Sequence, residues 1–261
     1  MKRQEERASR ITIIRDSWGI PHVYGKTDAD AVFGLMYTQC EEAFDKVERA
    51  YIEKLGRLSE VDGEGSLYND LLNRLMGDTS RAIEEYKKSP PEIKSLLHAF
   101  ADGINFYLYK NPQTKPLLLT HFEPWFPLLF TDGAYVSVKT DNLSIEDIKR
   151  MYNLPVATSF HLSSMLDVAT GSNGFAIGPA KTAAGRALLY INPHVSFYFR
   201  MEAHISSEEG LNAYGAITWG QFFIFQGFNE HCGWMHTSSM ADAADLYKDD
   251  LVEKEGKLYT V

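Results

Sequence analysis

Residues 170–178 read Thr-Gly-Ser-Asn-Gly-Phe-Ala-Ile-Gly and divide the chain into two parts of different character. They follow a Ser-rich segment and run directly into alternating apolar residues, which predicts a strand that begins close to Ser172. Cleavage of the bond between Gly171 and Ser172 would give Ser172 a free α-amino group. Such an amine has a reference pKa of about 7.7–8.0, so it can act as a base beside its own hydroxyl. The stretch therefore suits an N-terminal nucleophile, but a plain turn before a strand has the same sequence.

The part before this stretch is predicted to be mostly helical. Residues 11–15 alternate and are β-branched, which predicts a strand, and residues 22–24 resume a short one after a turn. Residues 27–30 have N-cap chemistry, and apolar residues keep helical spacing from there to about Leu58. Further helices are predicted over residues 71–88, 89–109 and 144–150, with a packed Pro- and aromatic-rich loop over residues 112–127.

The part after the stretch is predicted to be mostly strands. Turns at residues 182–185 and 207–210 separate some of them. A helix-rich segment followed by a strand-rich one indicates an α+β protein with a largely antiparallel sheet. We therefore divide the chain into a helix-rich segment 1–171 and a strand-rich segment 172–261. The strand candidates are residues 175–177, 186–191, 204–206, 212–217, 221–225 and 233–237.

Composition excludes some classes of partner. The chain has 261 residues, 44% of them hydrophobic and 23% charged, which is ordinary for a globular protein. Its net charge is −9 without a basic tract, which argues against nucleic-acid binding. No apolar stretch is long enough to span a bilayer, and the first residues lack the apolar core of a secretory signal. Cys40 and Cys232 either pair or stay free, and their number decides nothing about compartment.

Three further places carry candidate catalytic or metal-binding residues. His194 follows a predicted strand and is either an acid/base facing a nucleophile or a hydrogen-bonded loop histidine. Residues 233–239 are predicted to be a strand that leads into a polar turn, whose backbone N–H groups either stabilise an oxyanion or simply complete the turn. Asp242 and Asp245 open an acidic cluster that suits a hard cation such as Ca²⁺ or forms a solvated turn. No zinc, P-loop or Gly-x-Ser-x-Gly pattern is present.

Several motifs, taken in order, resemble those of a known family. In the first part they are residues 15–23, 28–37 and 56–60, and in the second part residues 171–173, 181–185, 192–194, 214–216, 227–229, 234 and 242–247. On these motifs almost the whole chain resembles the penicillin acylase family of N-terminal nucleophile hydrolases. It is most similar to the branch of cephalosporin, aculeacin and acyl-homoserine-lactone acylases. The resemblance implies that this chain forms part of an αββα sandwich.

The resemblance also implies roles for single residues. Ser172 would be the nucleophile, freed by self-cleavage after Gly171, and His194 would orient the substrate amide. The backbone N–H of Ser238 would supply half of an oxyanion hole. A structural Ca²⁺ would join the two chains of the cut α/β heterodimer through Asp242, Ala244 (by its carbonyl), Asp245 and Glu146. No organic cofactor is implied.

Two departures from the family pattern affect the expected function. The second oxyanion donor of the family is an Asn well beyond Val261, so we expect this chain to be one piece of a longer gene product that is incomplete for turnover by itself. A Pro-rich loop of the family is replaced by bulky aromatics at residues 218–223. Aromatics at residues 197–198 and 222–225 suit an apolar acyl chain or belong to the core.

We therefore predict an amidohydrolase that splits a small, linear amide into carboxylate and amine through an acyl-enzyme on Ser172. One alternative keeps the fold but acts on a peptide or secondary metabolite and never on β-lactams. Another is a non-catalytic, calcium-binding relative that stays uncut at Gly171. Members of the family are mostly exported, so the resemblance implies a periplasmic or secreted protein.

Overall fold

The structure of this chain is a computed structural model that describes residues 2–77, 79–129, 145–152, 171–195, 198, 200–237, 251–254 and 256–260. It begins with helix α1 (Lys2–Ala8) and the antiparallel strands β1 (Thr12–Arg15) and β2 (Pro21–Gly25). The two strands predicted near the N-terminus are thus confirmed. Asp16 shapes the turn between them, because its Oδ1 accepts the backbone N–H groups of Trp18 at 2.8 Å and Ile20 at 3.0 Å.

Helix α2 (Asp28–Lys54) is the longest element and begins where its N-cap chemistry predicts. The hydroxyl oxygen of Thr27 accepts the backbone N–H of Asp30 at 3.1 Å, which satisfies one of the free donors of the first turn. The helix bends at Ala43, whose backbone is not helical (φ −159°, ψ 71°). It ends at Lys54 rather than near Leu58, because Gly56 follows with a φ of +61°.

The prediction of one continuous helix over residues 71–88 is wrong. Two helices occupy this region, α4 (Leu67–Met76) and α5 (Thr79–Lys88). Gly77 separates them, because its backbone is extended (φ −115°, ψ 116°). The predicted helix ending near residue 109 and the short one before residue 150 are confirmed as α6 (Pro91–Lys110) and α7 (Ile145–Met151). Shorter helical turns are α3 (Ser59–Asp62), η1 (Glu64–Ser66) and η2 (Phe126–Leu129).

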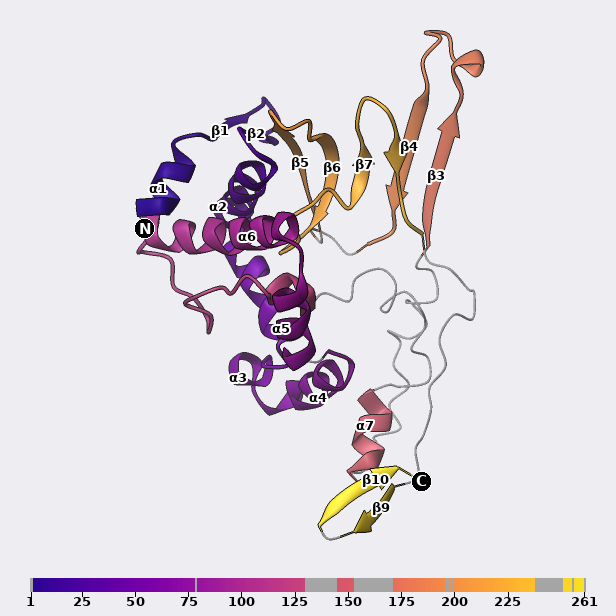
Figure 1. The fold of residues 1–261 in the computed structure, drawn as a ribbon. Helices are drawn as coiled ribbons and strands as arrows, with labels where there is room; N and C mark the ends of the chain where they lie inside the picture. The colour runs from indigo at the N-terminus through magenta and orange to yellow at the C-terminus, as the bar shows by residue number, and fades with distance from the viewer. Residues whose placement is uncertain are drawn as a thin grey trace.

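A six-stranded sheet joins the beginning of the chain to its second part (Figure 1). Its order is β1-β2-β5-β6-β7-β8, with β5 at Arg200–Ser207, β6 at Asn212–Thr218, β7 at Gln226–Phe228 and β8 at Gly233–Trp234. Every neighbouring pair is antiparallel except β2 and β5, which run parallel. The prediction of a largely antiparallel sheet is confirmed, but the first segment also supplies two strands to it.

The strand predicted over residues 221–225 is wrong. This segment is a loop, and the strand β7 follows it. The loop is held against α2, because the side-chain amide of Gln39 donates to the Gln221 carbonyl oxygen at 2.6 Å. Ile224 lies in this loop and is buried in the core. It is therefore apolar because it packs there, and not because it belongs to a strand. The strand predicted over residues 233–237 is shorter than expected, because β8 ends at Trp234.

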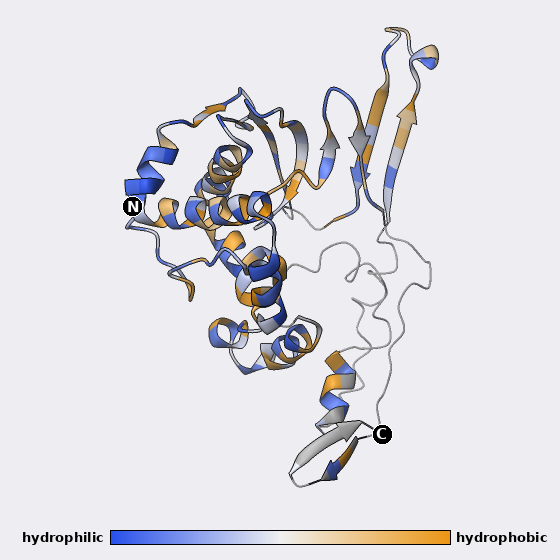
Figure 2. Ribbon diagram, viewed as in Figure 1, coloured by the Kyte–Doolittle hydropathy of each residue, from blue (hydrophilic) through white to orange (hydrophobic). Residues whose placement is uncertain are grey.

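A separate hairpin carries the nucleophile candidate. It consists of β3 (Ser172–Ile177) and β4 (Leu188–Pro193), joined through the short helix η4 (Pro179–Lys181), and it stands beside the larger sheet (Figure 1). Figure 2 shows hydrophobic residues along the outer part of its two strands and hydrophilic residues at its base. Phe175 and Tyr190 pair in the hydrophobic part, with exposures of 60% and 52%. A second hairpin pairs β9 (Leu251–Lys254) with β10 (Lys257–Thr260).

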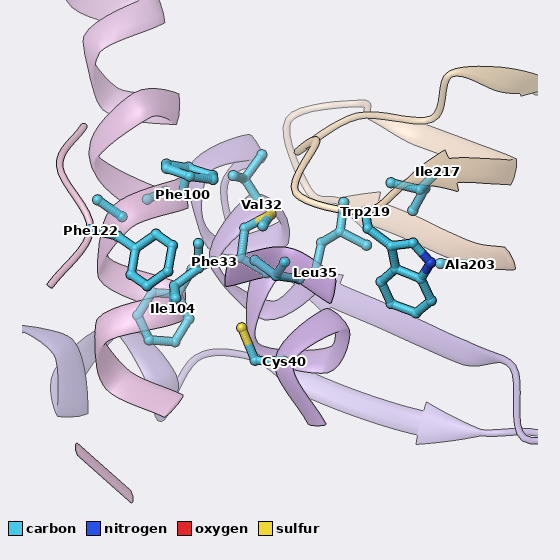
Figure 3. Packing of buried hydrophobic residues seen from close by; sticks show 14 of the residues in the cluster. Val32, Phe33, Leu35, Cys40, Phe100, Ile104, Phe122, Ala203, Ile217 and Trp219 are labelled. Carbon is cyan, nitrogen blue, oxygen red and sulfur yellow. The ribbon is translucent and has the colours of Figure 1, made fainter. Parts of the chain in front are cut away.

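The core lies around α2, between α6 on one side and the sheet on the other (Figure 3). Phe33 faces Phe106 of α6, with ring centroids 5.4 Å apart. Ala203, Ile217 and Trp219 fill the opposite side. Adjoining layers of helices and sheet confirm the predicted α+β class and fit part of an αββα sandwich. Among the helices that the structure describes, none is long and apolar enough to cross a membrane.

Candidate active site

Ser172 is the first residue of β3, at the hydrophilic base of the hairpin. Its partner in the ladder is Pro193 on β4, so the next residue, His194, leaves the hairpin directly beside it. Residues 172–177 and 188–193 pair in an unbroken antiparallel register, and this pairing fixes the position of Ser172 opposite Pro193. Gly171 precedes the strand, and a Cβ at this position would meet no atom within 4 Å.

Both reactive atoms of Ser172 are held by hydrogen bonds. Its backbone N–H donates to the hydroxyl oxygen of Thr237 at 3.0 Å. Its own hydroxyl oxygen accepts the backbone N–H of His194 at 3.3 Å. Acceptance from His194 leaves the Ser172 hydroxyl proton free to be donated elsewhere. The nitrogen that would become the base and the oxygen that would attack are therefore both oriented by neighbouring residues.

The ring of His194 takes part in a three-membered polar cluster with two asparagines. Its Nε2 lies 3.1 Å from the Nδ2 of Asn173 and 3.0 Å from the Oδ1 of Asn192. The amide of Asn173 also donates to the Oδ1 of Asn192 at 3.3 Å. Nε2 can accept from Asn173 when it is bare or donate to Asn192 when it is protonated. The cluster can therefore accommodate either tautomer of a histidine next to the nucleophile.

The segment that carries Thr237 is anchored in the larger sheet. The buried side chain of Gln226 donates from its amide to the His236 carbonyl oxygen at 2.8 Å. The Gln226 Oε1 in turn accepts from the Nη1 of Arg200 at 2.6 Å. The sheet therefore holds the backbone next to Thr237, the residue that contacts the Ser172 nitrogen.

The structure brings together only some of the predicted site residues. Gly171, Ser172 and His194 lie together at the base of the hairpin. Glu146 lies on α7, whose Ile148 is buried. The remaining predicted residues, Ser238, Asp242, Ala244 and Asp245, lie outside the described residues, so the predicted oxyanion donor and calcium ligands stay predictions. Over the described ranges no group of three or more His, Cys, Asp or Glu side chains could hold a metal ion.

Sequence reasoning assigned no role to the side chains of Asn173, Asn192 and Thr237, which surround Ser172 and His194. Asn173 and Asn192 belong to the motifs that flank Ser172 and His194, but nothing in their spacing predicts that their side chains meet across a hairpin. Thr237 is the last residue of the strand predicted over residues 233–237. The signal that could have identified it is a hydroxyl residue where a predicted strand ends, which is weak by itself.

The aromatic residues considered for an acyl pocket divide between core and surface. Phe222 packs against Phe100 of α6 with centroids 6.3 Å apart, and it lies against the hydrophobic core. Phe223 is 44% exposed. Tyr198 contacts the ring of Trp219, which is buried, with centroids 5.3 Å apart. Packing therefore accounts for Phe222, while Phe223 and Tyr198 present part of their rings to the surface.

A second polar cluster lies on the face of the sheet turned away from α2. His22 and His204 lie on the parallel strands β2 and β5, and their Nδ1 atoms are 3.2 Å apart. They line an open cavity of about 390 Å³ together with Tyr214. Burial, and then the neighbouring carboxylate of Glu202, raise the pKa of Tyr214. Its phenol therefore stays protonated at neutral pH and cannot serve as a base there.

A family model described as penicillin amidase matches residues 10–261. The chain belongs to the penicillin amidase family. The resemblance inferred from the motifs is thereby confirmed.

Relatives of this chain carry acylase names. The acyl-homoserine lactone acylase QuiP of Pseudomonas fluorescens is 23% identical over 305 residues, covering 97% of this chain and 36% of the relative. The acyl-homoserine lactone acylase PvdQ of Pseudomonas savastanoi pv. phaseolicola is 23% identical, covering 98% and 37%. The penicillin acylase 2 proenzyme of Pseudomonas sp. strain SE83 is 23% identical, covering 93% and 38%. The chain thus spans just over a third of the length of these relatives.

Among solved structures, the chain is similar to a thermostable penicillin G acylase from Alcaligenes faecalis. The match has 17% sequence identity and a TM-score of 0.44, and it covers 54% of this chain and 79% of that chain.

Proposed function

We propose that the protein containing this chain is an acylase that hydrolyses a linear amide through an acyl-enzyme on Ser172. The observation that carries this proposal is the geometry at Ser172. A serine at the start of a strand has its nitrogen bound to Thr237 and its hydroxyl oxygen bound to the His194 backbone. Membership of the penicillin amidase family supports the reaction class.

Maturation by self-cleavage is the first step of the proposal. The Ser172 hydroxyl oxygen attacks the carbonyl carbon of Gly171, a C–O bond forms, and the C–N bond between the two residues breaks. The proton lost by the hydroxyl ends on the Ser172 nitrogen, which becomes a free amine. Water then hydrolyses the ester and leaves Gly171 with a carboxylate. Such an amine next to its own hydroxyl is the N-terminal form of an activated nucleophile.

Substrate hydrolysis repeats the same chemistry on an external amide. The amine of Ser172 takes the hydroxyl proton, directly or through a water, while the oxygen attacks the substrate carbonyl. The backbone N–H of Ser238 is proposed to stabilise the resulting oxyanion. The leaving amine departs with a proton, and water cleaves the acyl-enzyme to release the carboxylate. His194 is proposed to orient the substrate amide.

Small amides are the proposed substrates. Relatives named acyl-homoserine lactone acylase and penicillin acylase support a substrate in which an acyl group is joined to an amine. Such a reaction needs no organic cofactor. By family, we also propose that the protein acts outside the cytoplasm.

A structural calcium ion and a two-chain product complete the proposal. The carboxylates of Glu146, Asp242 and Asp245 and the carbonyl of Ala244 form an all-oxygen donor set, which fits Ca²⁺. Bound there, the ion would supply a fixed positive charge that holds the cut chains together. It takes no part in the acyl transfer.

Intact mass under denaturing conditions tests the function. The full-length natural protein should appear as two pieces that meet at Gly171 and Ser172, whereas Ser172→Ala should appear as one. Ser9→Ala, a change of the same kind at an exposed helix end, should still give two pieces. The idea of self-cleavage is wrong if Ser172→Ala is still cut at this bond. An uncut natural protein would support the non-catalytic, calcium-binding alternative instead.

A further inference from the structure

The hydroxyl oxygen of Thr237 lies 3.0 Å from the nitrogen of the bond that would break during maturation. We infer that Thr237 is a positioning residue for the Ser172 nitrogen, first as the scissile amide and then as the free amine. This inference rests on the proposed function and adds a residue to it. The two partners are 65 residues apart in sequence: Ser172 begins β3 of the hairpin, whereas Thr237 follows β8 of the six-stranded sheet.

The contact between the hairpin and the Thr237 segment is closely fitted. A Cβ at Gly174 on β3 would lie only 1.7 Å from the sulfur of Met235. A Cβ at Gly233 would lie 2.3 Å from a methyl carbon of Leu189 on β4. At each of these two glycines, a side chain of the facing segment occupies the space that a Cβ would need. The Gln226 amide fixes the neighbouring His236 carbonyl from the other side at 2.8 Å.

During self-cleavage, this contact orients the amide plane. The Ser172 hydroxyl oxygen must reach the Gly171 carbonyl carbon, and the nitrogen must leave with one additional proton. Thr237 fixes the direction of the N–H bond, while the His194 backbone N–H holds the attacking oxygen at 3.3 Å. Holding reacting groups in a productive geometry lowers the barrier, because less orientational freedom is lost in the transition state.

After cleavage, the same oxygen would accept a hydrogen bond from the amine. An acceptor favours the ammonium form, because the charged group makes the stronger hydrogen bond. Loss of the acceptor should therefore lower the pKa of the Ser172 amine. The titratable side chains adjoining this contact, within the described part of the chain, are His194 and His236, and both remain in the variants below.

The test compares Thr237→Val, which keeps the shape and removes the hydroxyl, with Thr237→Ser, which keeps the hydroxyl. The fraction of cut full-length protein is followed by intact mass after synthesis. We expect Thr237→Val to slow cleavage by roughly tenfold and Thr237→Ser to stay within about threefold of the natural protein. Thr182→Val is the matched control, since Thr182 lies in the same hairpin and bonds only within its turn region in the contacts observed, to Pro179 and Arg186.

A second readout distinguishes the loss of this hydrogen bond from a loss of folding. Competitive labelling of the free Ser172 amine with acetic anhydride at about pH 5 to 9 gives its titration curve from the mass of the N-terminal peptide. The curve of cut Thr237→Val should move to lower pH, and that of Thr237→Ser should stay in place. A denaturant unfolding curve checks that each variant is folded.

The outcomes are distinguishable. If the natural protein is never cut, the proposed function fails before Thr237 is tested. If the natural protein is cut and Thr237→Val matches it in both rate and titration curve, only the positioning role is overturned. The role is also overturned if Thr182→Val slows cleavage as much as Thr237→Val does.

Discussion

At the scale of single residues, buried carboxylates organise loops that have no regular structure. Glu48 on α2 is 1% exposed. Its two oxygens accept the backbone N–H groups of Leu117, Leu118 and Leu119 at 2.9, 2.7 and 2.8 Å. These three donors belong to the Pro- and aromatic-rich loop, which has no ladder to satisfy them. A charge is therefore tolerated in the core because it completes the hydrogen bonds of a backbone segment.

Glu48→Ala should destabilise the fold strongly. Three backbone donors, of which the N–H of Leu119 is buried, would lose their acceptor, so we expect a loss of about 3 kcal/mol or more in the free energy of unfolding. Urea unfolding followed by circular dichroism measures it. Glu53→Ala is the control, because Glu53 is exposed on the same helix and its removal should change stability by less than about 0.5 kcal/mol. Equal effects of the two variants would contradict the assigned role.

The turn at Asp16 should make stability depend on pH. Desolvation alone raises the pKa of this carboxyl, but hydrogen bonds from the Trp18 and Ile20 N–H groups, together with His22, bring it below the ordinary value of 3.8. Because the folded-state pKa is lowered, the stabilisation is present above the unfolded pKa and is lost as pH falls through the folded one. The stability difference between the natural chain and Asp16→Asn should shrink between about pH 6 and pH 3. Urea midpoints at both pH values test this, and a constant difference would refute it.

At the scale of elements, the contact between α2 and α6 depends on a missing side chain. Gly103 lies within α6, where glycine is otherwise unfavourable by about 1 kcal/mol relative to alanine. A Cβ at this position would lie 2.5 Å from the carbonyl oxygen of Phe33 on α2. The close approach of two backbones therefore outweighs helix propensity at this residue.

Gly103→Ala should destabilise the fold although it improves helix propensity. The added methyl group must push α6 away from α2, which costs about 1–3 kcal/mol in a packed core. Gly65→Ala is the matched control, because a Cβ there would meet no atom within 4 Å. Thermal unfolding of the two variants provides the measurement. A Gly103→Ala protein as stable as its parent would show that the helices can separate without cost.

At the scale of the whole molecule, the two segments on either side of Ser172 are joined by buried contacts. Strand β2 of the first pairs with β5 of the second. Gln39 on α2 is fully buried, and its amide both donates to the Gln221 carbonyl oxygen at 2.6 Å and accepts the Gly220 N–H at 2.9 Å. The hydroxyl of Tyr51 donates to the Gly220 carbonyl oxygen at 2.6 Å. Cutting the chain between the segments would leave all these contacts intact.

We therefore expect cut protein to elute as one complex in native size-exclusion chromatography. Gln39→Leu should weaken the complex by about 2–4 kcal/mol, because two buried backbone groups lose their partner. Dissociation is followed as the urea concentration is raised. Gln113→Leu, at an exposed loop position, should dissociate at the same urea concentration as the parent. Separate elution of the pieces in native buffer would rule out this account of the interface.

Much of the local structure could be predicted from the sequence. The cap at Thr27 and the apolar spacing after it identified α2, and the alternation after Ser172 identified β3. The errors have a common cause. Residues 221–225 are apolar because they pack from a loop, and Gly77 breaks a helix that periodicity alone would continue. Periodicity records which face is buried and does not record what lies opposite it.

The sequence by itself determined that a helix-rich segment precedes a strand-rich one, the position of the Gly171–Ser172 junction and the family. These are local properties, because caps, periodicity and motifs lie within a few neighbouring residues. Only the tertiary structure decided that β2 runs parallel to β5, and that Thr237 meets the Ser172 nitrogen from 65 residues away. The physical reason is that such contacts depend on how whole elements pack, and a single hydroxyl leaves no periodic signal of its partner.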